Sequence, residues 1–352
     1  MSEIVSVIVG GSRWTAFESV SVVAAVKHAA RSFTLEIAAE AGAVETAATF
    51  QVFAPIQIYA NGDLLIDGYI DERAARLTGQ KGEITVSGRA KGADAVDSTA
   101  MHATGRFDNK SPLDIARALD AHGIGFTSSI DLSTLKEFQL TPGETLFRAV
   151  ERLARDQGAT LRGLPNGGID FWNATQATDR HAGGLVEGVN IEEIHSTLSG
   201  GNRHSHVHVR GQKYDGHGAE NLRIESIATD GAVPRYRPQV IVADGDIDKP
   251  RARKRARHHR DRKAGNGLKC IVGMATWRDD AGTIWTPGHR LWTESPFASV
   301  RQDMILEQVE FMQTSERTTA RLRLVDPRAY GGDKGKVNKS GAEWSQDDGD
   351  AS

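Results

Sequence analysis

The alternation of apolar and polar residues predicts that the chain begins with an all-β domain. Phe33, Leu35 and Ile37 are separated by single polar residues. Because successive side chains of a strand point to opposite faces, this period of two indicates a strand with one buried face. Asn61-Gly62 lies between two apolar runs and is typical of a tight hairpin turn. We assign residues 1–100 to this first β-domain.

A helical period replaces the alternation after residue 100. Ser111-Pro112 combines a capping residue with a first-turn proline and predicts the start of a short helix. Thr141 and Glu144 have the spacing of a capping box, and the apolar residues that follow predict a second helix that ends before Gly158. Two short apolar runs around an Asn-Gly-Gly turn then predict a hairpin. Residues 101–182 should therefore form a small α+β domain.

Strand-like patterns return after this domain and are interrupted once. A charged stretch that begins at Asp248 predicts a helix, with the Asp248 side chain as its cap and a proline in its first turn. We predict a discontinuous second β-domain made of residues 183–233 and 289–327, with an inserted α+β domain at 234–288. The expected fold class is a multidomain, β-rich α+β protein.

The end of the chain has a different composition. Residues 331–352 consist mainly of glycine, lysine, aspartate and serine, and Trp344 is their one aromatic residue. Such a segment cannot bury enough apolar surface to order alone, so we predict that the tail, residues 328–352, is disordered in isolation. A lone aromatic among polar residues is typical of an interface hot spot, and Trp344 is therefore a candidate partner contact.

Composition and charge exclude several classes of protein. The 352 residues include 43 basic and 46 acidic side chains, for a net charge of −3, so no overall field attracts nucleic acid or anionic lipid. No apolar run approaches the roughly 18 residues that span a bilayer, and the start lacks the pattern of a signal peptide. We expect a soluble chain that is assembled in the cytoplasm without membrane insertion. The single cysteine, Cys270, excludes an intrachain disulfide and is expected to be buried.

No motif of an enzyme is present in the sequence. A phosphate loop, a G-x-S-x-G elbow and an H-E-x-x-H helix are all missing. The aspartates from Asp244 start like a calcium loop, but Lys249 stands where that loop needs glycine and Arg255 where it needs glutamate. We therefore predict a non-enzymatic protein with no catalytic residues and no cofactor.

Three histidines could form a metal-binding edge. His204, His206 and His208 lie two residues apart, which on a strand would place all three imidazoles on the face opposite Val207 and Val209. A metal site usually needs a further ligand and supporting partners, and neither is visible in the sequence. We favour an exposed strand face and keep the three histidines as weak metal candidates.

The predicted helix after Asp248 is strongly basic. Eight lysines or arginines lie within the thirteen residues 251–263, and Ala252 with Ala256 provides a narrow face of small side chains. Two interpretations stay open, a solvated helix lying on its own domain or a contact with an acidic partner or nucleic acid. The candidate contact residues of the second interpretation are Arg251, Arg253, Lys254, Arg255, Arg257 and Arg260.

Several segments, read in order, resemble the baseplate hub family of Mu-like, contractile-tailed bacteriophages. They are Gly68-Tyr69-Ile70-Asp71, the run from Ser87 to Asp97, Arg235-Tyr236-Arg237-Pro238, the run from Val240 to Asp244, Trp277-Arg278 and Trp285-Thr286-Pro287. The resemblance covers nearly the whole chain up to Pro327. It implies a virion structural protein that forms a homotrimeric hub between the tail tube protein and the central spike protein, in contact with other baseplate proteins. It also implies that 1–100 and the discontinuous domain are two barrel-like, tube-forming β-domains, and that DNA passes through the ring.

Two functions from other classes compete with this interpretation. The segment from Thr141 to Leu146, with the helix after it, also resembles a LysM repeat, which would make the chain a peptidoglycan-binding tail module. A lysozyme-like cell-wall hydrolase would need two carboxylates facing each other across a cleft, and linear sequence cannot show such a pair.

Overall fold

The chain forms two compact units, each assembled from separate stretches of sequence. The computed structural model describes residues 3–40, 48–79, 81–176, 178–213 and 223–332. Unit 1 comprises Met1–Gly183, Val272–Arg290 and Leu306–Arg323, and unit 2 comprises Gly184–Ile271, Leu291–Ile305 and Leu324–Ser352.

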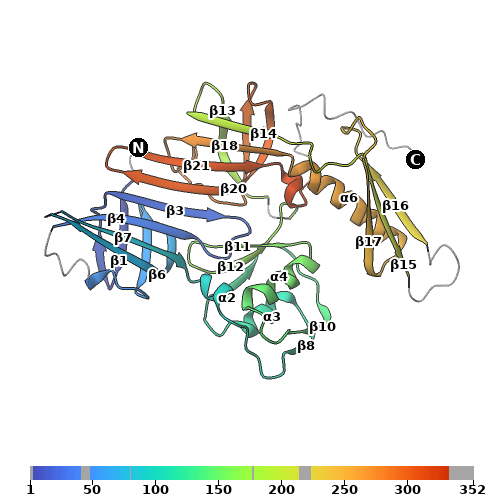
Figure 1. The fold of residues 1–352 in the computed structure, drawn as a ribbon, viewed down its shortest axis with the longest axis horizontal. Helices are drawn as coiled ribbons and strands as arrows, with labels where there is room; N and C mark the ends of the chain where they lie inside the picture. The colour runs from blue at the N-terminus through green and yellow to red at the C-terminus, as the bar shows by residue number, and fades with distance from the viewer. Residues whose placement is uncertain (1–2, 41–47, 80, 177, 214–222, 333–352) are drawn as a thin grey trace. The chain divides into compact units, whose positions relative to one another are not determined.

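Unit 1 contains an antiparallel sheet that begins at the N-terminus, drawn in blue and cyan in Figure 1. Its strands follow the predicted alternation, since Phe33, Leu35 and Ile37 are buried and Thr34 is exposed. The strand order is β20-β3-β4-β7-β6-β5-β1-β2, with every neighbouring pair antiparallel. These strands are β1 (Val5–Val9), β2 (Ser12–Trp14), β3 (Ser19–Ala25), β4 (Ser32–Glu40), β5 (Pro55–Ala60), β6 (Asp63–Thr78), β7 (Lys81–Ala90) and β20 (Val300–Thr314).

The described strands do not close into a barrel. The sheet of unit 1 ends at β2, which pairs with β1 alone among the described strands. The prediction of two barrel-like domains is therefore not confirmed, whereas the coarser prediction of a multidomain, mostly β chain is confirmed.

Two glycines allow β6 and β7 to approach each other closely. A Cβ atom on Gly68 would lie 2.0 Å from the carbonyl oxygen of Arg89, and one on Gly88 would lie 2.1 Å from the carbonyl oxygen of Tyr69. These separations are far inside van der Waals contact, so neither position can carry a side chain unless the backbone moves. Both glycines belong to the segments that carry the family resemblance, and their role is in strand packing.

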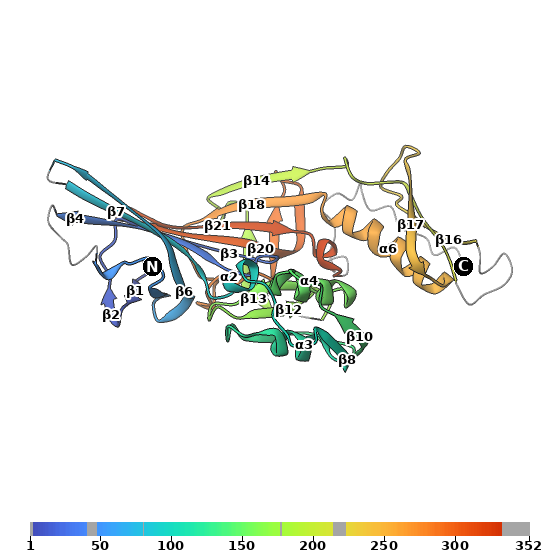
Figure 2. The ribbon, with the colours of Figure 1, turned by 60° about the horizontal axis from the view of Figure 1, so that its bottom comes forward.

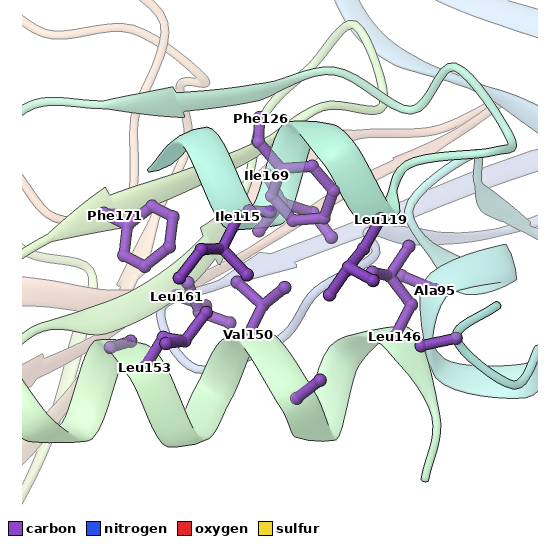
Figure 3. Close-up of a cluster of buried hydrophobic side chains, with 14 of the residues drawn as sticks. Ala95, Ile115, Leu119, Phe126, Leu146, Val150, Leu153, Leu161, Ile169 and Phe171 are labelled. Carbon is purple, nitrogen blue, oxygen red and sulfur yellow. The ribbon is translucent and has the colours of Figure 1, made fainter. Parts of the chain in front are cut away.

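A small α+β arrangement follows the sheet within unit 1. Helices α3 and α4 pack over β11, β12 and β9 around an apolar core, and Figure 3 shows Ile115 of α3 and Val150 of α4 pointing into it. Its elements are α2 (Ala93–Asp97), β8 (Arg106–Lys110), α3 (Pro112–Leu119), β9 (Phe126–Ser128), β10 (Leu135–Gln139), α4 (Leu146–Asp156), β11 (Thr160–Gly163) and β12 (Ile169–Trp172). The two predicted helices and the hairpin of β11 with β12 are confirmed.

One predicted helix start is wrong by four residues. The first helix begins as predicted, because the Ser111 side chain accepts a hydrogen bond from the Asp114 N–H. The second, α4, begins at Leu146, where Thr145 is the cap and accepts from the Arg148 N–H. The Glu144 side chain instead accepts from the Thr141 N–H at 2.6 Å, so the capping-box pair closes a turn in front of the helix.

Unit 2 contains a three-stranded sheet covered on one face by a long helix. Strand β15 (His206–Gln212) lies in the centre, antiparallel to β16 (Ile224–Thr229) and parallel to β17 (Pro238–Asp246). Helix α6 (Lys249–Gly265), drawn in orange, lies against these strands in Figures 1 and 2. The remaining elements of the chain are β13 (Arg180–Val186), β14 (Glu193–Leu198), β18 (Leu268–Met274), β19 (Arg290–Ser295), β21 (Thr318–Val325) and the 3-10 helix η1 (Pro327–Tyr330).

The strands group differently from the predicted division after residue 183. β17 pairs with β15, so residues on both sides of the predicted boundary at 233 and 234 share one sheet. Residues Val272–Arg290 belong to unit 1, although the prediction placed most of them in the insertion. Parallel pairing of strands that are distant in the sequence leaves no local signal. The apolar pattern of 206–229 therefore did not predict that β15 pairs with β17.

Candidate functional site: a cationic helix on a three-stranded sheet

Helix α6 is fixed on its sheet by a cap and a narrow apolar face. The Asp248 side chain accepts a hydrogen bond from the Arg251 N–H at 2.8 Å, which confirms the predicted cap. Ala252 and Ala256 are completely buried against Val209 and its neighbours on β15 and β16. Small side chains let the helix backbone approach the sheet closely, so the predicted alanine face is confirmed as the packing face.

The C-terminal end of α6 is held by η1. A Cβ atom on Gly265 would lie 2.3 Å from the backbone nitrogen of Ala329, so glycine is required where η1 touches the helix. Nearby, the Arg328 guanidinium donates to the Asp326 carboxylate at 2.8 Å, in a largely buried ion pair. The helix is therefore anchored at both ends and along one face, which limits the freedom of its exposed side chains.

The exposed part of α6 is almost purely cationic. The helix carries nine lysines or arginines against one aspartate, a net charge of +8, so the rest of the chain carries −11. Among the described residues, the structure gives no ion pair to Arg253, Lys254, Arg255 or Arg257, and all four side chains are exposed. The charge of the helix is thus largely uncompensated by the residues that the structure describes.

Two of the candidate contact residues are partly engaged locally. Arg260 is largely buried, donates to the Thr229 carbonyl at 3.0 Å and pairs with Asp261, so it holds the helix to β16. Arg251 lies 3.8 Å from the Asp248 carboxylate and stays exposed. The predicted set therefore divides into Arg260, which binds the sheet, and the five exposed cations.

This concentration of like charge is unfavourable for helix stability. Cations four residues apart, such as Arg251 with Arg255 and Arg253 with Arg257, each destabilise a helix by about 0.2–0.5 kcal/mol. The first turn has no acidic residue and contains Lys249 and Arg251 near the positive end of the helix dipole. A solvated helix face that mixes charges of both signs has no such repulsion. The cationic face of α6 therefore lowers the stability of the helix.

The histidine strand is shorter than predicted. β15 begins at His206, so His204 precedes it and only two histidines lie in the strand. Their imidazole centroids are 6.4 Å apart, on the face opposite the buried Val207 and Val209. The expected alternation is confirmed for these four residues, and the expectation that all three histidines share the strand is wrong.

Each histidine has its own surroundings rather than a common ligand. His208 Nδ1 lies 2.9 Å from a Glu225 carboxylate oxygen, and the His206 ring packs 5.4 Å from Tyr236. Burial lowers the pKa of His204, and the nearby charges of Arg237 and Lys263 act in the same direction. Among the residues that the structure describes, no group of three or more histidines, cysteines or acids is placed to hold a metal ion.

The segments of the family resemblance that lie in unit 1 hold that unit together. Arg278 donates to the Glu3 carboxylate at 2.9 Å, and its Nη1 lies 2.6 Å from an Asp63 carboxylate oxygen. The buried Trp277 donates from its indole N–H to the Thr319 carbonyl at 2.7 Å. Similarly, Arg89 pairs with the Asp71 carboxylate at 2.6 Å. Sequence inspection found these residues as a motif, but their separation along the chain hid their structural role.

A buried histidine that the sequence did not single out lies in the same unit. His181 Nδ1 lies 3.0 Å from an Asp279 carboxylate oxygen, and the Thr286 N–H donates to His181 Nε2 at 3.0 Å. Both ring nitrogens of His181 are in hydrogen-bond contact, so His181 and Asp279 hold the fold together at this point.

Comparison with known proteins places these features in a family. Residues 4–90 match the model of the Mu phage baseplate assembly protein GpP-like N-terminal domain, and residues 92–172 match that of the baseplate hub protein gp44-like second domain. The baseplate hub protein gp44 of Escherichia phage Mu is 29% identical over 304 residues, which cover 82% of this chain and 78% of that protein. By these matches the chain is similar to the Mu-like baseplate hub family.

Solved structures agree with the hub family in fold. The 43 kDa tail protein of prophage MuSo2 from Shewanella oneidensis has a TM-score of 0.81 at 22% identity, over 94% of this chain and 99% of that one. The tail protein from Neisseria meningitidis MC58 has a TM-score of 0.77 at 19% identity, with the same coverage. At these identities the likeness establishes the fold alone.

The family match settles the coarse function. The chain is a tail and baseplate component of a Mu-like bacteriophage, and its family is structural and not a known family of enzymes. The segment that resembles a LysM repeat, from Thr141 to Leu146, lies inside the stretch matched by the hub's second domain. No helix of the described residues is long and apolar enough to cross a membrane. Trp344 lies outside the described residues.

Proposed function

We propose that this chain forms the homotrimeric ring that joins the tail tube to the central spike and lets DNA pass. The observation that carries the proposal is the order of the two hub domains, matched consecutively at 4–90 and 92–172, in a chain whose fold matches a Mu-like prophage tail protein over 94% of its length. A hub that acts by assembly needs a stable fold and no reacting groups. Gly88, Arg89 and Arg278, which lie in the segments of the family resemblance, have structural roles in strand packing and ion pairs, as such a function requires.

Mass photometry tests the trimer directly. The purified chain, mixed with its tail tube and spike proteins, should give a species containing three copies of the 38.1 kDa chain. A chain that stays monomeric at micromolar concentration with every partner present would overturn the proposal.

A free strand edge supports ring closure between subunits. β5 pairs with β6 only as far as Tyr69, so residues 72–78 of β6 have β7 as their one partner among the described strands. An exposed edge is an aggregation hazard unless another strand or surface covers it. Leu77 in this stretch is 66% exposed, so its side chain would contact any surface that covers the edge.

Substitution of Leu77 tests this edge as a subunit contact. Leu77→Lys should leave the monomer folded and prevent trimer formation, because a buried lysine without a partner is costly at an interface. Met101→Lys is the matched control, since Met101 is also exposed and lies outside the strand edge. Equal trimer fractions for both variants would remove β6 from the interface.

We further propose that residues 1–100 and the second β-domain, which by strand pairing consists of β13, β14, β18, β19, β20 and β21, are two copies of one tube-forming fold. A hub that joins a threefold spike to a sixfold tube needs six similar interfaces from three chains, and two similar domains per chain supply them. The small domain 101–182, and the sheet of β15, β16 and β17 with helix α6, would then lie outside the ring. A cryo-EM structure of the assembled hub tests this, and two β-domains that fail to superpose would exclude it.

The proposed function also includes the absence of catalysis. His181 has both ring nitrogens occupied, and burial raises the pKa of the Cys270 thiol to about 12, so neither group can act as a base or nucleophile at neutral pH. A muramidase assay and a pull-down on insoluble peptidoglycan should both give background signal. Hydrolysis or tight wall binding by the purified chain would instead favour a cell-wall function.

A further inference from the structure

Four cations and one histidine at exposed positions of α6 form a continuous ridge. They lie at helical spacing on the face turned away from the buried Ala252 and Ala256. We name this surface the α6 ridge, and its members are Arg251, Lys254, Arg255, His258 and Arg262. At 1.5 Å per residue, the ridge extends over about 17 Å, with successive side chains about 5–6 Å apart.

From this ridge we infer that α6 binds the phosphodiester backbone of nucleic acid without regard to base sequence. Duplex DNA carries one negative charge per about 1.7 Å of its axis, so a row of cations of this length meets several phosphates at once. Arginine dominates the helix, with six arginines to three lysines, and its planar guanidinium binds phosphate oxygens in pairs. The inference goes beyond the hub proposal, because it requires neither a ring nor a trimer.

The composition of the ridge distinguishes nucleic acid from an acidic protein surface. Protein interfaces have an apolar centre that is depleted of charge, with aromatic anchors. The exposed residues of α6 include no apolar or aromatic side chain, from Arg251 to Arg262. Contacts with a phosphate backbone need no apolar centre, since their free energy comes from release of counterions. The exposed face has no tyrosine, phenylalanine or tryptophan on which bases could stack, so the binding is expected to ignore sequence.

The structure also shows why the ridge is available. Arg260, which could have joined it, instead donates to Thr229 on the sheet side of the helix. No carboxylate of the described residues pairs with Lys254 or Arg255, whereas Arg203 elsewhere in unit 2 pairs with Asp230 at 2.8 Å. The unpaired charge thus lies on the exposed side of a rigidly held helix, where Arg253 and Arg257 stand beside the ridge.

Fluorescence anisotropy with a short labelled DNA duplex of arbitrary sequence tests the inference. The full chain is titrated over a series of salt concentrations, and so is the ridge variant Arg251→Gln, Lys254→Gln, Arg255→Gln. Glutamine keeps the helix propensity and removes like-charge repulsion, so the variant should fold at least as well. The control variant Arg13→Gln, Arg321→Gln, Arg323→Gln removes the same charge from exposed positions in unit 1.

The ridge variant should bind the duplex on the order of 100-fold more weakly at low salt, and the slope of log affinity against log salt should fall by about three. The control variant should keep the slope of the natural chain. Equal losses in both variants would mean attraction by bulk charge and would overturn the inference, as would a slope that the ridge variant leaves unchanged.

A second measurement addresses the competing class of partner. Polyglutamate is titrated in place of DNA at the same charge concentration. Weaker binding than to DNA supports phosphate recognition, whereas equal or tighter binding means that the ridge takes carboxylates, and the inference fails. Mass photometry of the ridge variant with tube and spike proteins separates this inference from the hub proposal. Loss of DNA binding with normal trimer formation concerns the ridge alone, and loss of the trimer with normal DNA binding concerns the hub alone.

Discussion

Acidification should destabilise unit 1 through one histidine, His289. Its ring lies 4.9 Å from that of His181, and burial together with this neighbour lowers the pKa of His289 to about 4. Arg162 acts in the same direction, while Asp179, 4.0 Å from Nε2, and Asp279 oppose the shift. The native state therefore prefers the neutral imidazole.

The sign and size of the effect follow from this shift. The unfolded chain titrates near the ordinary pKa of 6.5, so it binds a proton before the native state does. The stabilising contribution is fully present above about pH 6.5 and is lost as the pH falls toward 4. A shift from 6.5 to about 4 corresponds to about 3 kcal/mol in total, of which roughly 2 kcal/mol is lost by about pH 5.

Urea unfolding followed by tryptophan fluorescence measures this loss. Trp285 packs edge-on against His181, so its emission reports on this part of unit 1. The variant His289→Gln keeps a polar side chain that does not titrate. Between about pH 7 and 5 its free energy of unfolding should therefore fall by roughly 2 kcal/mol less than that of the natural chain. Carboxylates titrate equally in both proteins and cancel in the difference. Parallel loss of stability in the two proteins between about pH 7 and 5 would refute the reasoning.

Three further predictions concern packing, reactivity and the tail. Gly88→Ala should destabilise the chain by about 3 kcal/mol or more, because the new Cβ would lie 2.1 Å from a backbone oxygen. In the control variant Gly200→Ala the new Cβ has nothing within 4 Å, so stability should change by less than about 0.5 kcal/mol. Thermal unfolding of both variants measures the difference. The Cys270 thiol should resist thiol reagents at about pH 8 until the protein unfolds, since its pKa is raised to about 12; rapid labelling of folded protein would contradict this. Deletion of residues 331–352, which include Trp344, should leave folding intact and weaken binding to the spike or tube protein, and unchanged affinity in a pull-down would exclude the tail as a contact.

Short-range features of this protein were predictable because their causes lie within a few residues. The alternation at Phe33, Leu35 and Ile37 predicted a strand with one buried face, and the structure buries all three. Asp248 was predicted as a cap and Ala256 as part of the packing face, and both are confirmed. Capping and periodicity depend on local backbone geometry, so sequence alone is sufficient for them.

The candidate site was only partly predictable. The cations of α6 were visible in the sequence, but Arg260 was grouped with the exposed ones because a charge run does not show which members face a sheet. The position of His204 outside β15 likewise depends on where pairing with β16 begins, at His206 with Thr229. These outcomes are decided by neighbouring strands and not by the residue types themselves.

Long-range pairing was decided by the tertiary structure alone. Ala25 pairs with Gln308 across β3 and β20, and Arg278 binds Glu3 although 275 residues separate them. The sequence determined which segments become strands and which helix carries the charge, because propensity, capping and apolar period act locally. The pairing of the strands depends on burying all of their apolar faces together. The free energy of this burial is a property of the assembled core and of no single segment.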